Sequence, residues 1–132
     1  MPETDMLFFD IGGTLADVEL PPLKLLLRPH VLDTLQRLGL AGCQIGIISD
    51  NGTIDPGAIK NALTVCGLMK HLAPELIFFG RKSSPAIFAE AVRKCGRQHR
   101  PNSCVFVGEN PAEREFALQA GLAALSPGVV IA

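Results

Sequence analysis

Residues 6–15 have the sequence MLFFDIGGTL, in which an apolar run ends at an aspartate that two glycines soon follow. The run from Met6 to Phe9 contains no polar residue, which is typical of a short strand that is covered on both faces. Strands of that kind occur mainly in parallel sheets with helices on both sides. This stretch therefore predicts an α/β fold with Asp10 at the end of its first strand.

The rest of the chain alternates between similar apolar runs and helical patterns. Further strands are predicted by apolar runs at 45–48, 76–79 and 104–107, and by a weaker run at 122–125. Apolar residues at helical spacing predict helices over 29–39, 56–67, 85–96 and 112–121. We expect a single three-layer α/β/α Rossmann-like domain over residues 1–132, with a mainly parallel sheet.

The composition restricts the function classes that need consideration. The chain has 132 residues, of which 48% are hydrophobic and 19% are charged, and its formal net charge is −1. These values suit one packed core and provide no overall positive field for a nucleic acid or an acidic membrane. The basic run at 93–100 falls at a predicted helix end and has no interleaved aromatic residue, so we expect a solvated helix end there.

The location is predicted from three absences in the sequence. No apolar run is long enough to span a membrane, and residues 1–5 lack the basic and apolar parts of a signal peptide. The scattered cysteines suit buried, reduced thiols better than a disulfide or zinc framework; they are Cys43, Cys66, Cys95 and Cys104. We expect a cytoplasmic protein with no nucleic-acid or membrane partner.

Polar residues follow the predicted strands at their carboxyl ends. Asp10, Ser49 and Glu109 stand just past the carboxyl ends of apolar runs, and Lys82 follows the third run by three residues. In a parallel sheet these ends share one edge, where ligands bind. Each residue alone has an ordinary structural explanation: a cap, a turn, a solvated charge, or an acid that opens a helix. Their convergence favours a site in which carboxylates hold Mg²⁺ and the lysine and hydroxyl bind phosphate.

Four segments resemble motifs of the haloacid dehalogenase (HAD) superfamily, whose members are mostly Mg²⁺-dependent phosphatases. In chain order, the matching segments are LFFDIGGTL at 7–15, IGIIS at 45–49, KSSPAIF at 82–88 and VGENPAE at 107–113. The resemblance implies that Asp10 is a nucleophile that forms an aspartyl-phosphate, and that the substrate is a phosphorylated small molecule or macromolecule. It also implies that Lys82 assists catalysis.

The resemblance assigns the remaining site residues to phosphate and metal. It implies a phosphate-binding group made of Ser49, Asp50, Asn51 and Lys82. It also implies a Mg²⁺ site made of Asp10, the backbone carbonyl of Gly12, Glu109 and, further out, Glu113. Mg²⁺ prefers such oxygen ligands.

Two positions depart from the family pattern. Gly12 stands where the family has an aspartate that acts as general acid and base, a role typically worth about 10²–10⁴ in rate. Asp17 and Asp50 are candidate replacements. Glu109 is one methylene longer than the usual aspartate, and Mg²⁺ tolerates little distortion. These departures predict a weakened phosphatase, with a catalytically inactive binding or regulatory module of the same fold as the alternative.

The spacing between motifs predicts that no cap domain is present. The family inserts a cap either soon after the first motif or between the second and the third, but here only residues 15–28 separate Thr14 from the predicted helix at 29–39, and only residues 50–81 separate Ser49 from Lys82. The apolar stretch at 18–27 is a candidate flap or subunit contact, or it packs on its own sheet, so a homo-oligomer is one possibility. Sugar kinases of the actin-like fold have a phosphate loop similar to residues 10–14, but they need two lobes and about twice this length or more. Their loop also leads straight into the second strand of a hairpin, whereas Pro21 and Pro22 intervene here.

Overall fold

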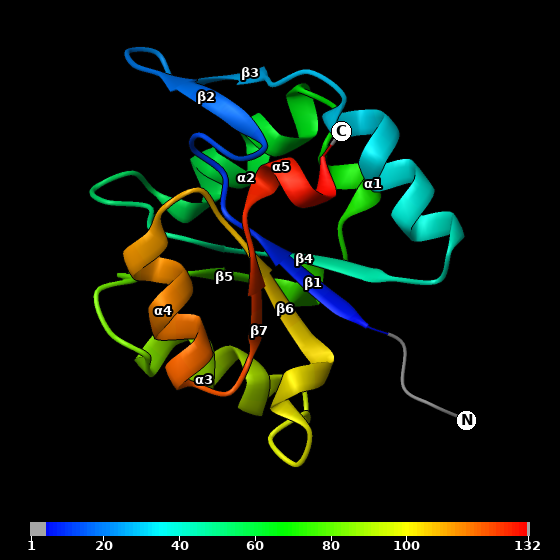
Figure 1. Ribbon diagram of the computed structural model, residues 1–132. Coiled ribbons are helices and arrows are strands. Elements are labelled where there is room, and N and C mark those ends of the chain that lie inside the picture. Colours follow the sequence, from blue (N-terminus) through cyan, green and yellow to red (C-terminus); the bar gives the residue numbers. More distant parts are fainter. Residues whose placement is uncertain (1–4, 132) are drawn as a thin grey trace.

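Five parallel strands form the central sheet of the computed structural model, which describes residues 5–131 (Figure 1). Residues 1–4 and 132 lie outside the described residues. They include most of the segment in which we expect no signal peptide, and both ends of the predicted 1–132 domain. The strand order is β5-β4-β1-β6-β7. The bounds are β1 Met6–Phe9, β4 Gln44–Ser49, β5 Ile77–Phe79, β6 Cys104–Val107 and β7 Ala123–Leu125.

Helices cover both faces of this sheet. Alternate residues of β1 point to opposite sides, and because all of them are apolar, both faces must be buried. Leu7 and Phe9 pack with α1 and α2 on one face, whereas Met6 and Phe8 pack with α3 and α4 on the other. The helices are α1 Val31–Leu40, α2 Pro56–Val65, α3 Ala86–Lys94, α4 Pro111–Gln119 and the short α5 Pro127–Val130. Short 3-10 helices span Met69–His71, Pro74–Leu76 and Pro101–Ser103. The predicted three-layer α/β fold with a mainly parallel sheet is confirmed.

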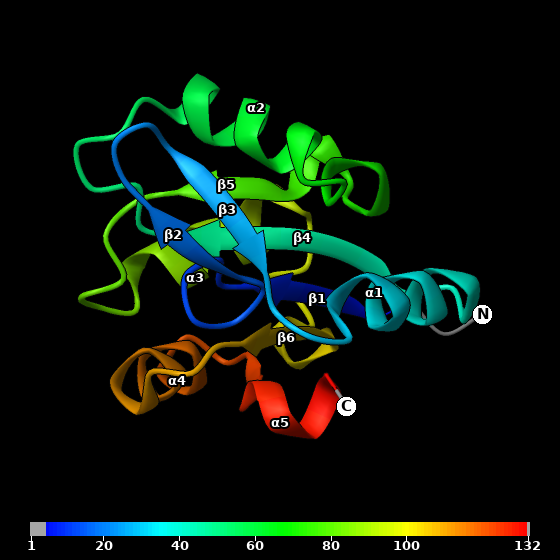
Figure 2. The ribbon, with the colours of Figure 1, turned by 90° about the horizontal axis from the view of Figure 1, so that it is seen from above.

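A hairpin separate from the sheet follows β1. Strands β2 (Ala16–Glu19) and β3 (Lys24–Leu27) pair antiparallel, and Figure 2 shows this hairpin beside α2. The strand that follows residues 10–14 therefore pairs with β3 and belongs to a different sheet from β1. The cis Pro21–Pro22 bond lies in the turn, so neither proline removes a hydrogen bond from the paired strands. In the described part of the chain, this hairpin and the helices named above are the only elements between the strands of the sheet.

Two sequence-based expectations need correction away from the sheet edge. The basic run at 93–100 is not wholly solvated, because Arg97 is buried and donates a hydrogen bond to Ser103 Oγ at 3.2 Å. All four cysteines are free thiols, as expected, but only Cys104 is buried. Burial still raises the pKa of the Cys95 thiol to about 11, with Cys104 and Glu75 acting in the same direction and Arg97 opposing them. None of the helices in residues 5–131 is long and apolar enough to cross a membrane.

Candidate functional site

The carboxyl ends of β1, β4 and β6 meet at one edge of the sheet. Phe9 of β1 is in register with Ile47 of β4 and with Val107 of β6, so the residues that follow these strands are neighbours in space. A cavity of about 310 Å³ opens at this edge. It is lined by every site residue that the sequence predicts: Asp10, Gly12, Ser49, Asp50, Asn51, Lys82, Glu109 and Glu113.

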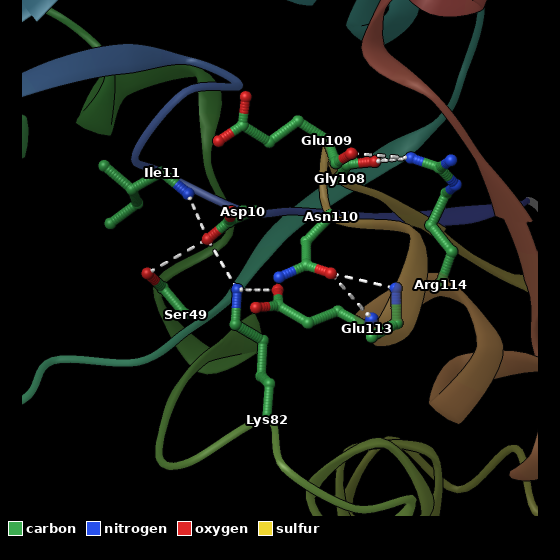
Figure 3. Close-up of polar contacts among 10 residues, drawn as sticks. Asp10, Ile11, Ser49, Lys82, Gly108, Glu109, Asn110, Glu113 and Arg114 are labelled. Carbon is green, nitrogen blue, oxygen red and sulfur yellow. Dashed lines mark hydrogen bonds and ion pairs between the residues drawn. The ribbon is translucent and has the colours of Figure 1, made fainter.

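Asp10 has one carboxylate oxygen that is fully engaged and one that is not. Its Oδ1 accepts hydrogen bonds from the backbone N–H of Ile11 at 2.9 Å, from Lys82 Nζ at 2.6 Å and, at a long 3.4 Å, from Ser49 Oγ (Figure 3). No hydrogen bond or ion pair in the described part of the chain engages Oδ2. These contacts fix the orientation of the carboxylate and leave Oδ2 available to a ligand or a reacting atom.

Lys82 lies between two carboxylates. Its Nζ is 2.6 Å from Asp10 Oδ1 and 2.7 Å from Glu113 Oε1, and its side chain is only 3% exposed. The ammonium group also lies 5.5 Å from the centre of the Phe106 ring. Glu113 Oε1 is buried and lacks the alignment of a hydrogen bond, so its contact with Lys82 is an ion pair only. Lysines are rarely buried unless they are paired in this way.

Glu109 lies on the opposite side of the cavity, above the two-glycine turn. A Cβ atom added to Gly13 would lie within 2.6 Å of both Glu109 carboxylate oxygens, and Gly13 has a φ of +76°. Both observations explain why a glycine stands at this position. Among residues 5–131, no three His, Cys, Asp or Glu side chains gather closely enough to hold a metal ion. The predicted metal ligands therefore share one cavity without forming a closed cluster.

The segment after β4 uses its polar side chains to build a turn. Asp50 Oδ1 accepts a hydrogen bond from the backbone N–H of Gly52 at 2.8 Å, and Asn51 Nδ2 donates to the carbonyl of Ile54 at 2.8 Å. The turn chemistry that this sequence indicates is thus present. Both side chains also line the cavity, so the two roles do not exclude each other.

The position of the missing aspartate is open. A Cβ atom added to Gly12 would contact only Val18 Cγ2, at an ordinary 3.7 Å. Of the two candidate replacements, Asp17 forms a surface ion pair with Arg28 at 3.0 Å and does not line the cavity. Asp50 lines the cavity but is bound to Gly52. Asp17 is therefore not positioned to replace the missing acid.

Two residues that support the site were not predicted. Asn110 caps α4 by accepting hydrogen bonds from the N–H groups of Ala112 and Glu113, at 2.8 and 3.4 Å. Arg114 Nη1 donates to the carbonyls of Gly108 and Glu109, at 2.8 and 2.9 Å. An asparagine before a proline and a glutamate is a recognisable capping signal. The contacts of Arg114 are to backbone atoms, which no sequence pattern reveals.

The charge and chemistry of the lining fit a hard dication. The charged side chains that line the cavity are four carboxylates and one ammonium group: Asp10, Asp50, Glu109, Glu113 and Lys82. An anionic phosphate group would be repelled by this excess of negative charge unless a cation entered with it. Carboxylate and carbonyl oxygens are the ligands that Mg²⁺ prefers. The donor set at this edge therefore fits Mg²⁺.

Comparison with known proteins agrees with this fold. A model of haloacid dehalogenase-like hydrolases matches residues 19–121. No curated protein matches the sequence. An uncharacterized protein from Listeria monocytogenes serotype 4b has a TM-score of 0.79 at 22% identity, over 92% of this chain and 77% of its own.

Two further solved structures are informative. D,D-heptose 1,7-bisphosphate phosphatase from B. bronchiseptica, solved with magnesium and phosphate, has a TM-score of 0.74 at 17% identity. The match covers 92% of this chain and 79% of that one. A hydrolase from Streptococcus pneumoniae TIGR4 has a TM-score of 0.72 at 15% identity, over 92% and 91% of the two chains. At these identities the similarity establishes the fold.

Proposed function

This chain belongs to the haloacid dehalogenase-like hydrolases, and from that membership we propose that it is a Mg²⁺-dependent phosphatase that works through an aspartyl-phosphate on Asp10. The observation that carries the proposal is the asymmetry of the Asp10 carboxylate. Three donors hold Oδ1, while Oδ2 has no hydrogen bond or ion pair to the described residues, and Asp10 lines the cavity. A nucleophile held in one orientation with one oxygen available suits attack on phosphorus.

In the first step, a carboxylate oxygen of Asp10 forms a bond to phosphorus and the bond from phosphorus to the leaving oxygen breaks. The leaving group keeps that electron pair. Lys82 Nζ lies 2.6 Å from the Asp10 carboxylate, so its positive charge offsets part of the negative charge that gathers on the phosphoryl oxygens. Ser49, Asp50 and Asn51 border the same space, and this segment would bind these oxygens.

The proposed metal site consists of Asp10, the backbone carbonyl of Gly12 and Glu109, with Glu113 behind them. When bound there, Mg²⁺ neutralises negative charge on the phosphoryl group and on the surrounding carboxylates. The excess of carboxylates in the cavity lining supports this assignment. Glu113 also pairs with Lys82, and this contact holds the lysine close to Asp10.

In the second step, water attacks phosphorus, phosphate leaves, and the Asp10 carboxylate is restored. The attacking water must lose a proton, and Gly12 has no side chain to accept it. A positioned acid or base is typically worth about 10²–10⁴ in rate. We therefore expect this step to be slow and the aspartyl-phosphate to accumulate.

Rapid mixing with 4-nitrophenyl phosphate and Mg²⁺ tests the proposal. We expect a burst of nitrophenolate equal to the enzyme concentration, followed by slow turnover, because the second step limits the rate. EDTA and the Asp10→Asn substitution should each abolish the burst. The absence of any burst or turnover in folded protein would contradict the proposal.

A binding or regulatory module without turnover remains the second candidate, and Gly12 is the observation that favours it. Such a module would bind inorganic phosphate with Mg²⁺ but would neither release nitrophenolate nor become phosphorylated. The intact group of Asp10, Ser49 and Lys82 argues for the enzyme. The same group of residues supports a phosphorylated substrate. We also propose a cytoplasmic location, with which the free thiols agree.

A further inference from the structure

Part of the cavity lining is an apolar wall. Val18, Leu23 and Leu25 of the hairpin segment form one part of this wall, and Ile54, just before α2, and Ile59, within α2, form the other. Figure 2 shows the hairpin and α2 next to each other, and β3 contacts α2. The part of a substrate that projects beyond the phosphoryl group would therefore meet methyl and methylene groups.

This wall provides no positive charge for a second anionic group. Lys82 is the only Lys, Arg or His among the described residues that line the cavity, and it is already shared by Asp10 and Glu113. A leaving group with a carboxylate or a second phosphate would be repelled by the carboxylates and would find no partner. The lining thus favours an uncharged, apolar leaving group.

The cavity also lacks a positioned proton donor for the leaving group. Gly12 has no side chain, and the nearest atom to a Cβ there is a methyl carbon of Val18. Two of the other carboxylates are engaged elsewhere, Asp50 by the N–H of Gly52 and Glu113 by Lys82, and Glu109 is one of the proposed Mg²⁺ ligands, which must be ionised to bind the metal. A leaving group that departs easily without a proton is therefore preferred.

We propose that the site acts on phosphate monoesters of apolar phenols, a substrate class that rests on the phosphatase function proposed above. In the first step the Asp10 carboxylate binds phosphorus and the bond from phosphorus to the phenolic oxygen breaks. The phenolate leaves with that electron pair and is later protonated by water. An alkoxide is far more basic and needs its proton during bond breaking, which this site does not supply.

A matched pair of esters tests the leaving group. Phenyl phosphate and benzyl phosphate have similar apolar bulk, but the first releases a phenolate and the second an alkoxide. We expect kcat/KM, measured with Mg²⁺, to be about 10²-fold or more higher for phenyl phosphate. Equal values for the two esters would overturn the substrate class and leave the phosphatase function standing, whereas no reaction with either would overturn both.

The substitution Gly12→Asp tests whether the missing proton donor at this position causes the preference for phenolate leaving groups. A Cβ atom is tolerated there, because it makes only an ordinary contact and Gly12 is outside the left-handed region. We expect the variant to raise kcat/KM for benzyl phosphate by about 10²–10⁴-fold and to change phenyl phosphate by less than about tenfold. Gly128→Asp adds the same charge away from the cavity and should change neither. If the ratio of the kcat/KM values for the two esters were the same in Gly12→Asp as in the wild-type protein, the inference would be contradicted.

Binding of non-hydrolysable phosphonates tests the apolar wall without turnover. By calorimetry in the presence of Mg²⁺, benzylphosphonate should bind about tenfold more tightly than methylphosphonate, because its ring is buried against the wall. Leu23→Asn should remove that difference. Leu26→Asn, three residues further along and outside the cavity lining, should preserve it. Equal affinity of the wild-type protein for the two phosphonates would overturn the proposed substrate class.

Discussion

At the residue scale, the ion triad of Lys82, Asp10 and Glu113 tolerates substitution least. Its side chains are 3%, 12% and 19% exposed, so water compensates little for a lost partner. Removing one member of a buried ion pair leaves an uncompensated charge, which typically costs about 3–5 kcal/mol. The same triad positions the proposed nucleophile, which joins stability to function at these residues.

Replacing the lysine should therefore destabilise the fold as well as stop catalysis. We expect Lys82→Met to lower the free energy of unfolding in urea by about 3 kcal/mol or more. Lys94→Met removes an exposed contact with Glu90, at 3.2 Å, and should cost no more than about 0.5 kcal/mol. Similar costs for the two variants would show that the triad is not a tight buried contact.

A double-mutant cycle separates the lysine–glutamate contact from other effects. Glu113→Gln should be destabilising in the wild-type protein, yet it should recover part of the stability that Lys82→Met loses, because it removes an unpaired charge. The expected coupling is about 1–3 kcal/mol, measured by urea unfolding of all four proteins. Strict additivity would refute the contact.

The chemical roles of these residues can be predicted from the sequence more readily than the residues that they contact. Asp10 and Ser49 could be placed because they come directly after or at the end of buried strands, and such ends share one edge in a parallel sheet. The contact of Lys82 with Glu113 depends on how α4 and the loop before α3 pack, which no local spacing determines. The same limit applies to Arg114, whose acceptors are backbone carbonyls.

At the element scale, two close approaches hold the sheet edge in place. A Cβ atom on Gly46 of β4 would lie 2.3 Å from the carbonyl oxygen of Leu76, so only glycine lets this strand approach the segment before β5. Arg114 of α4 fixes the loop that joins β6 to its own helix by binding two carbonyls. The first feature sets the spacing between β4 and the segment that leads into β5, and the second fixes the loop that carries Glu109.

A methyl group at Gly46 should be poorly tolerated. We expect Gly46→Ala to lower the free energy of unfolding by about 1–3 kcal/mol, since a backbone atom stands in the way. Gly39→Ala in α1 is the control, because nothing lies within 4 Å of its Cβ. In a helix this change should stabilise by about 0.5–1 kcal/mol. Urea unfolding with the same sign for both variants would contradict the packing described here.

Loss of the arginine contacts should loosen the loop at 108–110. Arg114→Ala leaves two carbonyls without their donor and should lower stability by about 1–3 kcal/mol. It should also speed hydrogen exchange at the first turn of α4. Arg93→Ala, which loses only a 3.8 Å surface contact with Glu90, should change neither quantity. Unchanged exchange in Arg114→Ala would show that the arginine does not restrain the loop.

Strand prediction succeeds where burial leaves a continuous apolar run. The strands at 6–9 and 104–107 have the bounds that their sequences indicate, and Leu76 is the one residue of its run that belongs to a 3-10 helix. The hairpin was not predicted because Lys24–Leu27 lacks the alternation of a half-exposed strand. Helix α5 has four residues, too few for a periodic pattern.

At the scale of the whole molecule, local charge matters more than net charge. The chain carries a formal net charge of −1, yet the cavity is lined by four carboxylates and one ammonium group. Phosphate should therefore bind only together with a divalent cation. The need for a divalent cation distinguishes the proposed site from a positively charged surface, which would bind phosphate without a metal ion.

Thermal unfolding can reveal this linkage without turnover. Inorganic phosphate with Mg²⁺ should raise the Tm, because a ligand at 100 times its Kd stabilises the folded state by about 2.7 kcal/mol. Phosphate with EDTA should leave the Tm unchanged. An equal rise with and without Mg²⁺ would contradict the proposed metal site.

Phosphorylation of Asp10 can be observed directly. The protein is mixed with phenyl phosphate and Mg²⁺, quenched in acid within the first turnover, and its intact mass and peptides are measured. We expect an adduct of one phosphoryl group on the peptide that contains Asp10, and no adduct in Asp10→Asn. No adduct in the wild-type protein, or an adduct on another residue, would contradict the proposed role of Asp10.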